Sequence, residues 1–265
     1  MDTLNFEVVN GVGWVRFARP DKHNPLDAEL RTDLMTVLEQ IRKEPAIRVL
    51  VLTGSPGVFC AGGNLHVLHE HLDAGPHYWQ QRLKTGLRLI QDILNLGCPV
   101  IAAVDGPAMG AGFSLALCAD LVVASPRARF SMAYLRLGLV PDLGALYLLP
   151  RAVGVQRAKE LMFSTREIDA HEAHQLGLVM EIQDSETLEA RVRAIAESLT
   201  QAAPTAVALT KAALNVSLDS DRQTLFTLEA ASQAAAFSAP EPRVAIEAIL
   251  AKQPPPFRGF PKVRV

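Results

Sequence analysis

Residues 51–65 read VLTGSPGVFCAGGNL, and residues 100–120 read VIAAVDGPAMGAGFSLALCAD. Each stretch opens with an apolar run typical of a buried strand, continues into a glycine-rich loop and leads into a helical segment. The same unit of strand, glycine loop and helix therefore occurs twice in this part of the chain. Such alternation predicts an α/β fold with largely parallel strands, and it places ligand sites at the turns that lead from strand to helix.

The segments around these two stretches fit the same plan. Residues 6–9 and 12–17 alternate in polarity around Asn10, whose pairing with a following glycine suits a tight turn, so a β-hairpin is expected there. Apolar residues recur at helical spacing over residues 28–43, with Asp27 in the N-cap position. Further elements are expected as helices over residues 79–94 and 115–118 and as strands over residues 100–104 and 121–124.

Beyond Ser185 the pattern changes to helices alone, and these are rich in alanine. They are expected over residues 188–202, 204–216, 221–237 and 241–252. Helices with few large side chains bury little by themselves, so they should pack on the core or on a neighbouring subunit. We therefore expect an α/β core over residues 1–200 and a C-terminal helical region over residues 201–265.

The composition indicates a soluble globular protein. Hydrophobic residues make up 49% of the 265 residues and charged residues 20%, and 26 Lys+Arg stand against 28 Asp+Glu. This balance gives no overall attraction to nucleic acid or to an anionic membrane. The uncharged stretch over residues 106–119 is too short to span a bilayer, and the first residues lack the features of a secretory signal.

The three cysteines, Cys60, Cys98 and Cys118, lack the paired spacing of a zinc site or a redox motif, so we expect them to be reduced and the protein to be cytoplasmic. His66 and His69 share a helical face, with His71 nearby, but no further ligand of suitable spacing is visible. No metal site is therefore expected.

The two glycine loops can present free backbone amides to a ligand. The second loop opens a helix at a Gly-Ala-Gly turn, whose amides and helix dipole favour an anion. A single glycine loop is most often a simple connection between elements. Two such loops that converge, however, would form a site for developing negative charge.

The order of several short motifs carries a resemblance to a known family. They are Arg19-Pro20, Asn24-Pro25-Leu26, Phe59-Cys-Ala-Gly-Gly63, Gly110-Ala-Gly112, Gly138-Leu-Val-Pro-Asp142 and Leu149-Pro-Arg-Ala-Val-Gly154. From about residue 5 to residue 260 this order resembles the crotonase (enoyl-CoA hydratase/isomerase) superfamily. In its Asp142 motif the chain most resembles enoyl-CoA isomerases of the phenylacetate-pathway type.

The resemblance implies a spiral of ββα units, a C-terminal helical region that forms trimers or dimers of trimers, and an acyl-CoA thioester as substrate. Coenzyme A then enters as part of the substrate, and no separate cofactor is needed. The resemblance assigns the two amides that hold the thioester oxygen to Gly63 and Ala111. It assigns substrate binding to Lys22, His23, Ala61, Gly62, Asn64, Leu65 and Gly110, with Lys252 and Lys262 as weaker candidates for phosphate contacts.

The chain departs from the hydratase pattern at two positions. Where hydratases of the family carry two glutamates, it has Ser114 and Tyr134. A hydroxyl and a phenol, whose usual pKa is about 10, cannot activate water and deliver a proton as two carboxylates do. Efficient hydration is therefore not expected; Tyr134 is expected to shape the acyl pocket or donate a hydrogen bond, and Ser114 to pack.

Asp142 falls where some isomerases of the family carry a catalytic aspartate and where its dehalogenases carry a nucleophile. Locally it is also a candidate N-cap for a helix over residues 143–149, and both roles are compatible. A carboxylate at a helix N-terminus is expected to stay ionised. The leading hypothesis is an isomerase that uses Asp142 as acid and base. Alternatives are an enoyl-CoA hydratase, a hydrolase or dehalogenase, and a non-catalytic acyl-CoA-binding protein.

Overall fold

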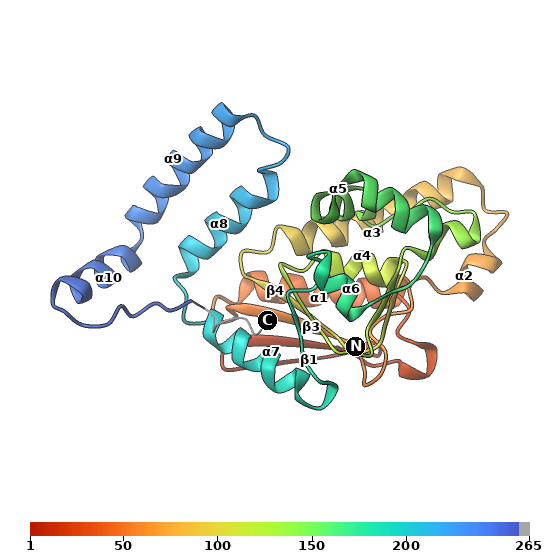
Figure 1. Cartoon of the computed structure of the whole chain (residues 1–265), viewed down its shortest axis with the longest axis horizontal. Coiled ribbons are helices and arrows are strands. Elements are labelled where there is room, and N and C mark those ends of the chain that lie inside the picture. Colours follow the sequence, from red (N-terminus) through yellow and green to blue (C-terminus); the bar gives the residue numbers. More distant parts are fainter. Residues whose placement is uncertain (260–265) are drawn as a thin grey trace.

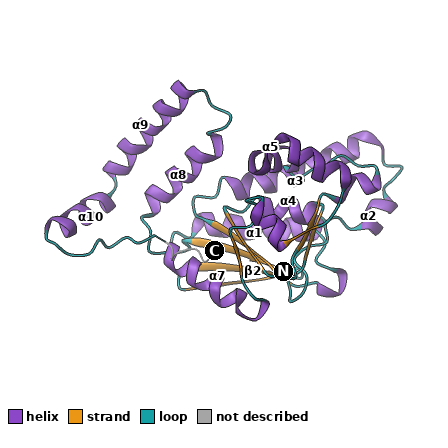
Figure 2. Cartoon of the chain, viewed as in Figure 1, coloured by secondary structure: helices purple, strands orange, loops and turns teal. Residues whose placement is uncertain are grey.

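A six-stranded sheet with helices on both faces forms the centre of the molecule, and a three-stranded sheet lies beside it (Figure 1, Figure 2). The computed structural model describes residues 1–259. Its strands are β1 (Leu4–Val9), β2 (Val12–Phe17), β3 (Val49–Thr53), β4 (Val100–Val104), β5 (Pro107–Met109), β6 (Leu121–Ala124), β7 (Arg129–Ser131), β8 (Ile168–Asp169) and β9 (Glu181–Ile182).

The large sheet has the strand order β1-β2-β3-β4-β6-β9. β1 and β2 form the predicted antiparallel hairpin, turning at Asn10, which has a φ of 52°. From β2 to β9 neighbouring strands run parallel, as the repeated unit of strand, loop and helix predicted. The small sheet, β5-β7-β8, is mixed, so the α/β class is confirmed with both sheets mixed.

Ten α-helices lie within residues 1–259, and most of them follow the predicted segments. They are α1 (Ala28–Lys43), α2 (Leu65–Glu70), α3 (Gly75–Leu94), α4 (Ala111–Leu117), α5 (Ala145–Ser164), α6 (Ala170–Gln175), α7 (Ser185–Leu199), α8 (Pro204–Val216), α9 (Arg222–Ser238) and α10 (Pro240–Leu250). Two short 3-10 helices, η1 (Pro20–Lys22) and η2 (Ala133–Leu137), complete the set. Both α1 and α8 have the predicted bounds. None of these helices is long and apolar enough to cross a membrane.

The central sheet is buried on both faces because alternate side chains of its strands pack against different helices. Leu50 and Leu52 of β3 belong to the larger core, together with apolar residues of α1, α3 and α4. Val49 and Val51 face the other way and pack with residues of α7. Strands covered on both faces read as continuous apolar runs, which is why they could be predicted from the sequence.

The last three helices project from the core as an arm (Figure 1). Residues of α9 and α10 are all partly or fully exposed, in agreement with the expectation that alanine-rich helices bury little within their own chain. One of the contacts that join the arm to the core is made by Lys211 of α8, which is 8% exposed. Its ammonium group donates to the carboxylate of Asp120 at 2.7 Å and to the carbonyl of Cys98 at 3.1 Å.

Several expected helix starts are wrong: α3 begins at Gly75 instead of residue 79, and α7 at Ser185 instead of residue 188. The helix expected over residues 115–118 begins four residues earlier, at Ala111. The helix expected to begin at Leu143 begins at Ala145, so Asp142 does not cap it, and the N-cap residue is Gly144. The physical reason is the backbone between them: Leu143 and Gly144 have φ angles of 50° and 81°, outside the right-handed helical region.

Candidate functional site

The two glycine loops lie directly against each other. The amide of Cys60 donates to the carbonyl of Pro107 at 3.0 Å, and the amide of Met109 donates to the carbonyl of Cys60 at 3.0 Å. The close approach requires glycine at position 112, because a Cβ there would lie 2.0 Å from the Cys60 carbonyl oxygen. The turns that follow β3 and β4 therefore converge, as the sequence indicated.

The amides of Gly63 and Ala111 are close together, and neither donates a hydrogen bond to any residue that the structure describes. Ala111 is the first residue of α4, so its amide has no carbonyl partner within the helix. A Cβ on Gly62 would lie 3.4 Å from the Ala111 nitrogen, and the amide of Gly63 comes next along the chain. Two unpaired donors at one point can stabilise an oxygen that gains negative charge.

The loop that carries Lys22 and His23 packs on the first glycine loop. The carbonyl of His23 accepts from the amide of Ala61 at 3.0 Å, and the amide of Leu26 donates to the carbonyl of Gly62 at 2.8 Å. The side chains of Lys22 and His23 are exposed beside this contact. The structure thus brings these predicted substrate-binding positions to the edge of the convergence point.

The remaining predicted substrate-binding positions are arranged differently. The Asn64 side chain caps α2, accepting from the amide of His66 at 3.1 Å, while Leu65 is exposed. Lys252 follows α10, which belongs to the arm, on the far side of the molecule from α2 in Figure 1. Within one chain it is not brought to the glycine loops. Lys262 lies outside the described residues.

Ser114, Tyr134 and Asp142 meet beside the second glycine loop, and we call these three residues the Asp142 cluster. Ser114 Oγ and Tyr134 Oη are 2.9 Å apart. Both hydroxyl oxygens also lie within hydrogen-bond distance of the backbone carbonyl oxygen of Asp142, Ser114 Oγ at 3.1 Å and Tyr134 Oη at 3.4 Å. The Tyr134 ring packs near Gly110, where a Cβ would lie 3.9 Å from it. Ser114 therefore does more than pack: it fixes Tyr134 against the segment that carries Asp142.

The Asp142 carboxyl group is largely buried, and its Oδ1 has no hydrogen-bond partner among the described residues. Burial raises the pKa of this carboxyl group, although the Tyr134 hydrogen bond and the positive charges of Arg31 and Arg82 act in the opposite direction. The expected place of Asp142 at the N-terminus of a helix is wrong, since α5 begins at Ala145 and its N-cap residue is Gly144. A raised pKa makes Asp142 a stronger base than an exposed aspartate.

Tyr134 remains protonated at neutral pH. Burial, followed by the nearby negative charge of Asp142, raises the pKa of its phenol well above the usual range. The phenol can therefore donate a hydrogen bond, but it cannot serve as a base. Among the groups of the Asp142 cluster only the carboxylate can remove a proton.

Sequence reasoning missed Arg31, a charged residue buried beside this cluster. Arg31 is 7% exposed, and its Nε has no hydrogen-bond partner among the described residues. A signal was present, because Arg31 lies three residues before Leu34 and seven before Leu38, on the apolar stripe of α1. An arginine side chain on such a stripe is rarely buried unless its charge is paired.

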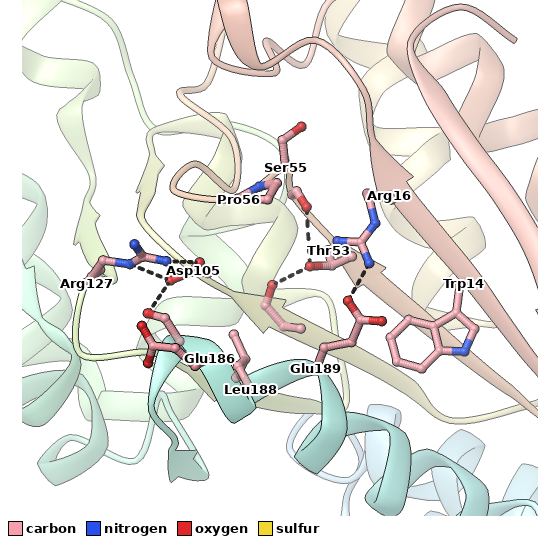
Figure 3. Close-up of a pocket in the computed structure, with 13 residues that line it drawn as sticks. Trp14, Arg16, Thr53, Ser55, Pro56, Asp105, Arg127, Glu186, Leu188 and Glu189 are labelled. Atoms are coloured by element: carbon pink, nitrogen blue, oxygen red, sulfur yellow. Dashed lines mark hydrogen bonds and ion pairs between the residues drawn. The ribbon is translucent and has the colours of Figure 1, made fainter.

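A separate pocket lies at the ends of β3 and β4, on the face of the sheet that α7 covers (Figure 3). Its charged groups are satisfied by one another: Arg127 pairs with Asp105 at 2.6 Å, and Arg16 pairs with Glu189 at 2.7 Å. Asp105 also accepts from Ser125 at 2.6 Å. Because these partners are internal, neither arginine of the pocket is left unpaired for an anionic ligand.

The histidines near the first glycine loop do not gather around one point that could hold a metal ion. No group of three or more His, Cys, Asp or Glu side chains in residues 1–259 is arranged to bind one. Instead, the ring of His71 stacks on the ring of Tyr78 at 4.8 Å, and its Nδ1 lies 2.9 Å from the carbonyl of Val67. The ring stacking joins the end of α2 to α3.

Comparison with known proteins gives consistent matches over almost the whole chain. The family model described as "Enoyl-CoA hydratase/isomerase" matches residues 7–260. The chain is 33% identical to the 1,2-epoxyphenylacetyl-CoA isomerase of Escherichia coli K12, over 98% of this chain and 99% of that protein. It is 37% identical to the human mitochondrial enoyl-CoA hydratase domain-containing protein 2, over 77% of this chain and 71% of that protein.

A solved structure is more similar still. The crystal structure of an enoyl-CoA hydratase/isomerase from Cupriavidus metallidurans CH34 superposes with a TM-score of 0.96 and is 77% identical. The match covers 100% of this chain and 99% of that one.

Proposed function

Because the chain belongs to the enoyl-CoA hydratase/isomerase (crotonase) family, we propose that it moves the double bond of an enoyl-CoA thioester, with Asp142 as acid and base. The family and the crotonase fold are those predicted from the motifs, and so is the class, an enzyme acting on acyl-CoA. Membership of the family does not decide between isomerisation and hydration, because the family contains both kinds of enzyme. The observation that carries the choice of isomerisation is the single base in the Asp142 cluster.

We assign the oxyanion hole to the amides of Gly63 and Ala111. Removal of a proton beside a thioester carbonyl moves negative charge onto its oxygen, and each well-placed donor stabilises that charge by about 3 kcal/mol. Both amides are unpaired and adjacent, which supports this role. They belong to the backbone, so the side chain at 111 is free to be alanine.

In the proposed reaction, the Asp142 carboxylate removes a proton from the α carbon of a 3-enoyl-CoA. The electron pair then spreads over the enolate that the two amides hold. Asp142 returns the same proton to the γ carbon, which leaves a 2-enoyl-CoA. One group that gives back what it takes suffices for this transfer, whereas hydration needs one group to activate water and another to protonate carbon.

For the coenzyme A part of the substrate we propose the loop around Lys22 and His23, together with the backbone from Ala61 to Leu65 and Gly110. The packing of the first loop on the second supports this, since it puts exposed groups of both at one edge of the oxyanion hole. Tyr134 is proposed to shape the acyl pocket and to orient Asp142 by its hydrogen bond.

The proposed function is tested by following a 3-enoyl-CoA and a 2-enoyl-CoA in parallel, by absorbance of the conjugated thioester and by mass. We expect the 3-enoyl substrate to be converted to the 2-enoyl isomer faster than water is added to the 2-enoyl one. Rapid gain of the mass of water by the 2-enoyl substrate, with the 3-enoyl one untouched, would assign the protein as a hydratase instead.

We expect the protein to form a trimer or a dimer of trimers through the arm. Large apolar side chains of α9 and α10 are exposed, among them Phe226, Phe237 and Ile249. Burying such side chains on a neighbouring copy removes apolar surface from water. Multi-angle light scattering should report a multiple of three subunits, and Ile249→Asp should weaken the assembly. A stable monomer at micromolar concentration would contradict this prediction.

A further inference from the structure

Arg31 is a buried cation without a partner, next to the group that is proposed to move the proton. Its side chain forms no hydrogen bond or ion pair with any residue in 1–259, and its Nε is fully buried and unpaired. Burial is unfavourable enough to lower the pKa of its guanidinium. A buried charge normally has a partner that pairs with it directly, so this position calls for a further negative group beyond the carboxylates nearby.

The packing around Gly86 directs Arg31 toward the Asp142 cluster. A Cβ on Gly86 of α3 would lie 3.6 Å from Arg31 Nη1 and 2.5 Å from Leu143 Cδ2. The guanidinium and the residue that follows Asp142 therefore meet at the same point on α3. The missing side chain at position 86 leaves room for both.

The charges in this region are not balanced. Arg82 of α3 acts on Arg31 as a like charge, while Asp142 acts on it as the opposite charge. Asp27, on the turn before α1, also attracts Arg31, but it is already paired with Arg19 at 2.8 Å. Since Tyr134 is a neutral phenol, Arg31 and Arg82 share Asp142 as the available carboxylate among the described residues.

We propose that Arg31 selects acyl-CoA thioesters whose acyl group ends in a carboxylate, which the guanidinium binds inside the acyl pocket. A guanidinium offers two parallel donors that match the two oxygens of a carboxylate. The bound carboxylate supplies the missing negative charge, and the reacting carbons lie between it and the thioester. This assignment rests on the proposed acyl-CoA function and adds the class of acyl group, a monothioester of a dicarboxylic acid.

The test measures binding without reaction, by isothermal titration of the full chain with saturated thioesters. Glutaryl-CoA is compared with pentanoyl-CoA, and adipyl-CoA with hexanoyl-CoA, so that each pair differs chiefly by a terminal carboxylate in place of a methyl group. We expect the dicarboxylic thioester to bind about 10-fold tighter or more in at least one pair. Arg31→Met should remove that preference, and Arg31→Lys should keep part of it.

The matched control is Arg42→Met on the same helix, because Arg42 is a surface arginine paired with Asp92 at 2.7 Å. This variant should keep the wild-type preference. Equal binding within both pairs, or a uniform loss of all four ligands in Arg31→Met, would overturn the assignment of Arg31 while leaving acyl-CoA binding in place. If none of the four thioesters binds at millimolar concentration, the proposed function itself fails, and this assignment fails with it.

Discussion

Replacing Asp142 with asparagine is expected to lower isomerase turnover by about 10² or more, while the protein still folds and binds acyl-CoA. Asparagine has nearly the same shape as aspartate but cannot remove a proton. The other two members of the Asp142 cluster cannot substitute for it, since Ser114 is a neutral hydroxyl and the pKa of Tyr134 is raised far above neutrality. Steady-state kinetics with a 3-enoyl-CoA measure the effect.

The pH dependence of kcat/KM in the wild-type protein tests the role of Asp142 independently. Activity requires the carboxylate form, so kcat/KM should fall as the pH decreases through the pKa of Asp142. Because burial raises that pKa, the fall should occur above about pH 3.9, where an exposed aspartate titrates. The acid limb should be absent from the residual activity of Asp142→Asn.

A stability measurement shows whether Asp142→Asn loses turnover because the base is missing or because the protein unfolds. The folded state holds the Asp142 proton at pH values where the unfolded chain has lost it, so this group stabilises the fold at low pH and less so as pH rises through its raised pKa. At neutral pH, Asp142→Asn should therefore be at least as stable as wild type in urea unfolding. Asp92→Asn, at a surface ion pair, serves as the control. Full turnover in Asp142→Asn would refute the proposed mechanism.

Gly112→Ala is expected to reduce turnover by about 10² and to destabilise the protein by about 1–3 kcal/mol. The added methyl group would lie 2.0 Å from the carbonyl oxygen of Cys60, so the two glycine loops must separate. Separation moves the Gly63 amide away from the Ala111 amide, and a misplaced donor no longer stabilises the enolate. Turnover and urea unfolding, measured on the same preparation, give the two effects.

Gly97→Ala is the matched control for this substitution. Gly97 is exposed, and a Cβ there would meet only the Cβ of Ala208, at 4.0 Å. We expect both turnover and stability to stay close to wild type. If Gly112→Ala retained normal turnover, the close contact between the loops would not be what aligns the two amides.

The parts of the fold that repeat a simple period could be predicted from the sequence. The hairpin around Asn10, the helix α1 and the buried strands β3 and β4 all depend on local patterns of apolar residues. The start of α5 could not be predicted in this way. Leu143 adopts a positive φ although leucine rarely does, so the conformation is imposed by packing, which a local pattern does not record.

In the candidate site, too, some parts could be predicted from local sequence patterns and others could not. The glycine turns carry their own signal, because their sequence permits the close approach of two backbones. The Asp142 cluster depends on contacts between residues far apart in the chain, such as Ser114 and Tyr134, and the burial of Arg31 depends on α3 and on the turn before α5. Neither the charge balance around Asp142 nor the burial of Arg31 can be predicted from the spacing of residues along the sequence.

Lys211 connects the C-terminal arm to the strand that leads to the second glycine loop. Its ammonium group holds α8 to Asp120, whose carboxylate also accepts from the amide of Val100, at the first residue of β4, at 2.7 Å. β4 leads directly to the loop that ends at Ala111. The Lys211–Asp120 ion pair therefore couples a shift of the arm to the start of the strand that leads to the proposed oxyanion hole, so in the proposed assembly a neighbouring subunit would act on the alignment of its donors without touching the substrate.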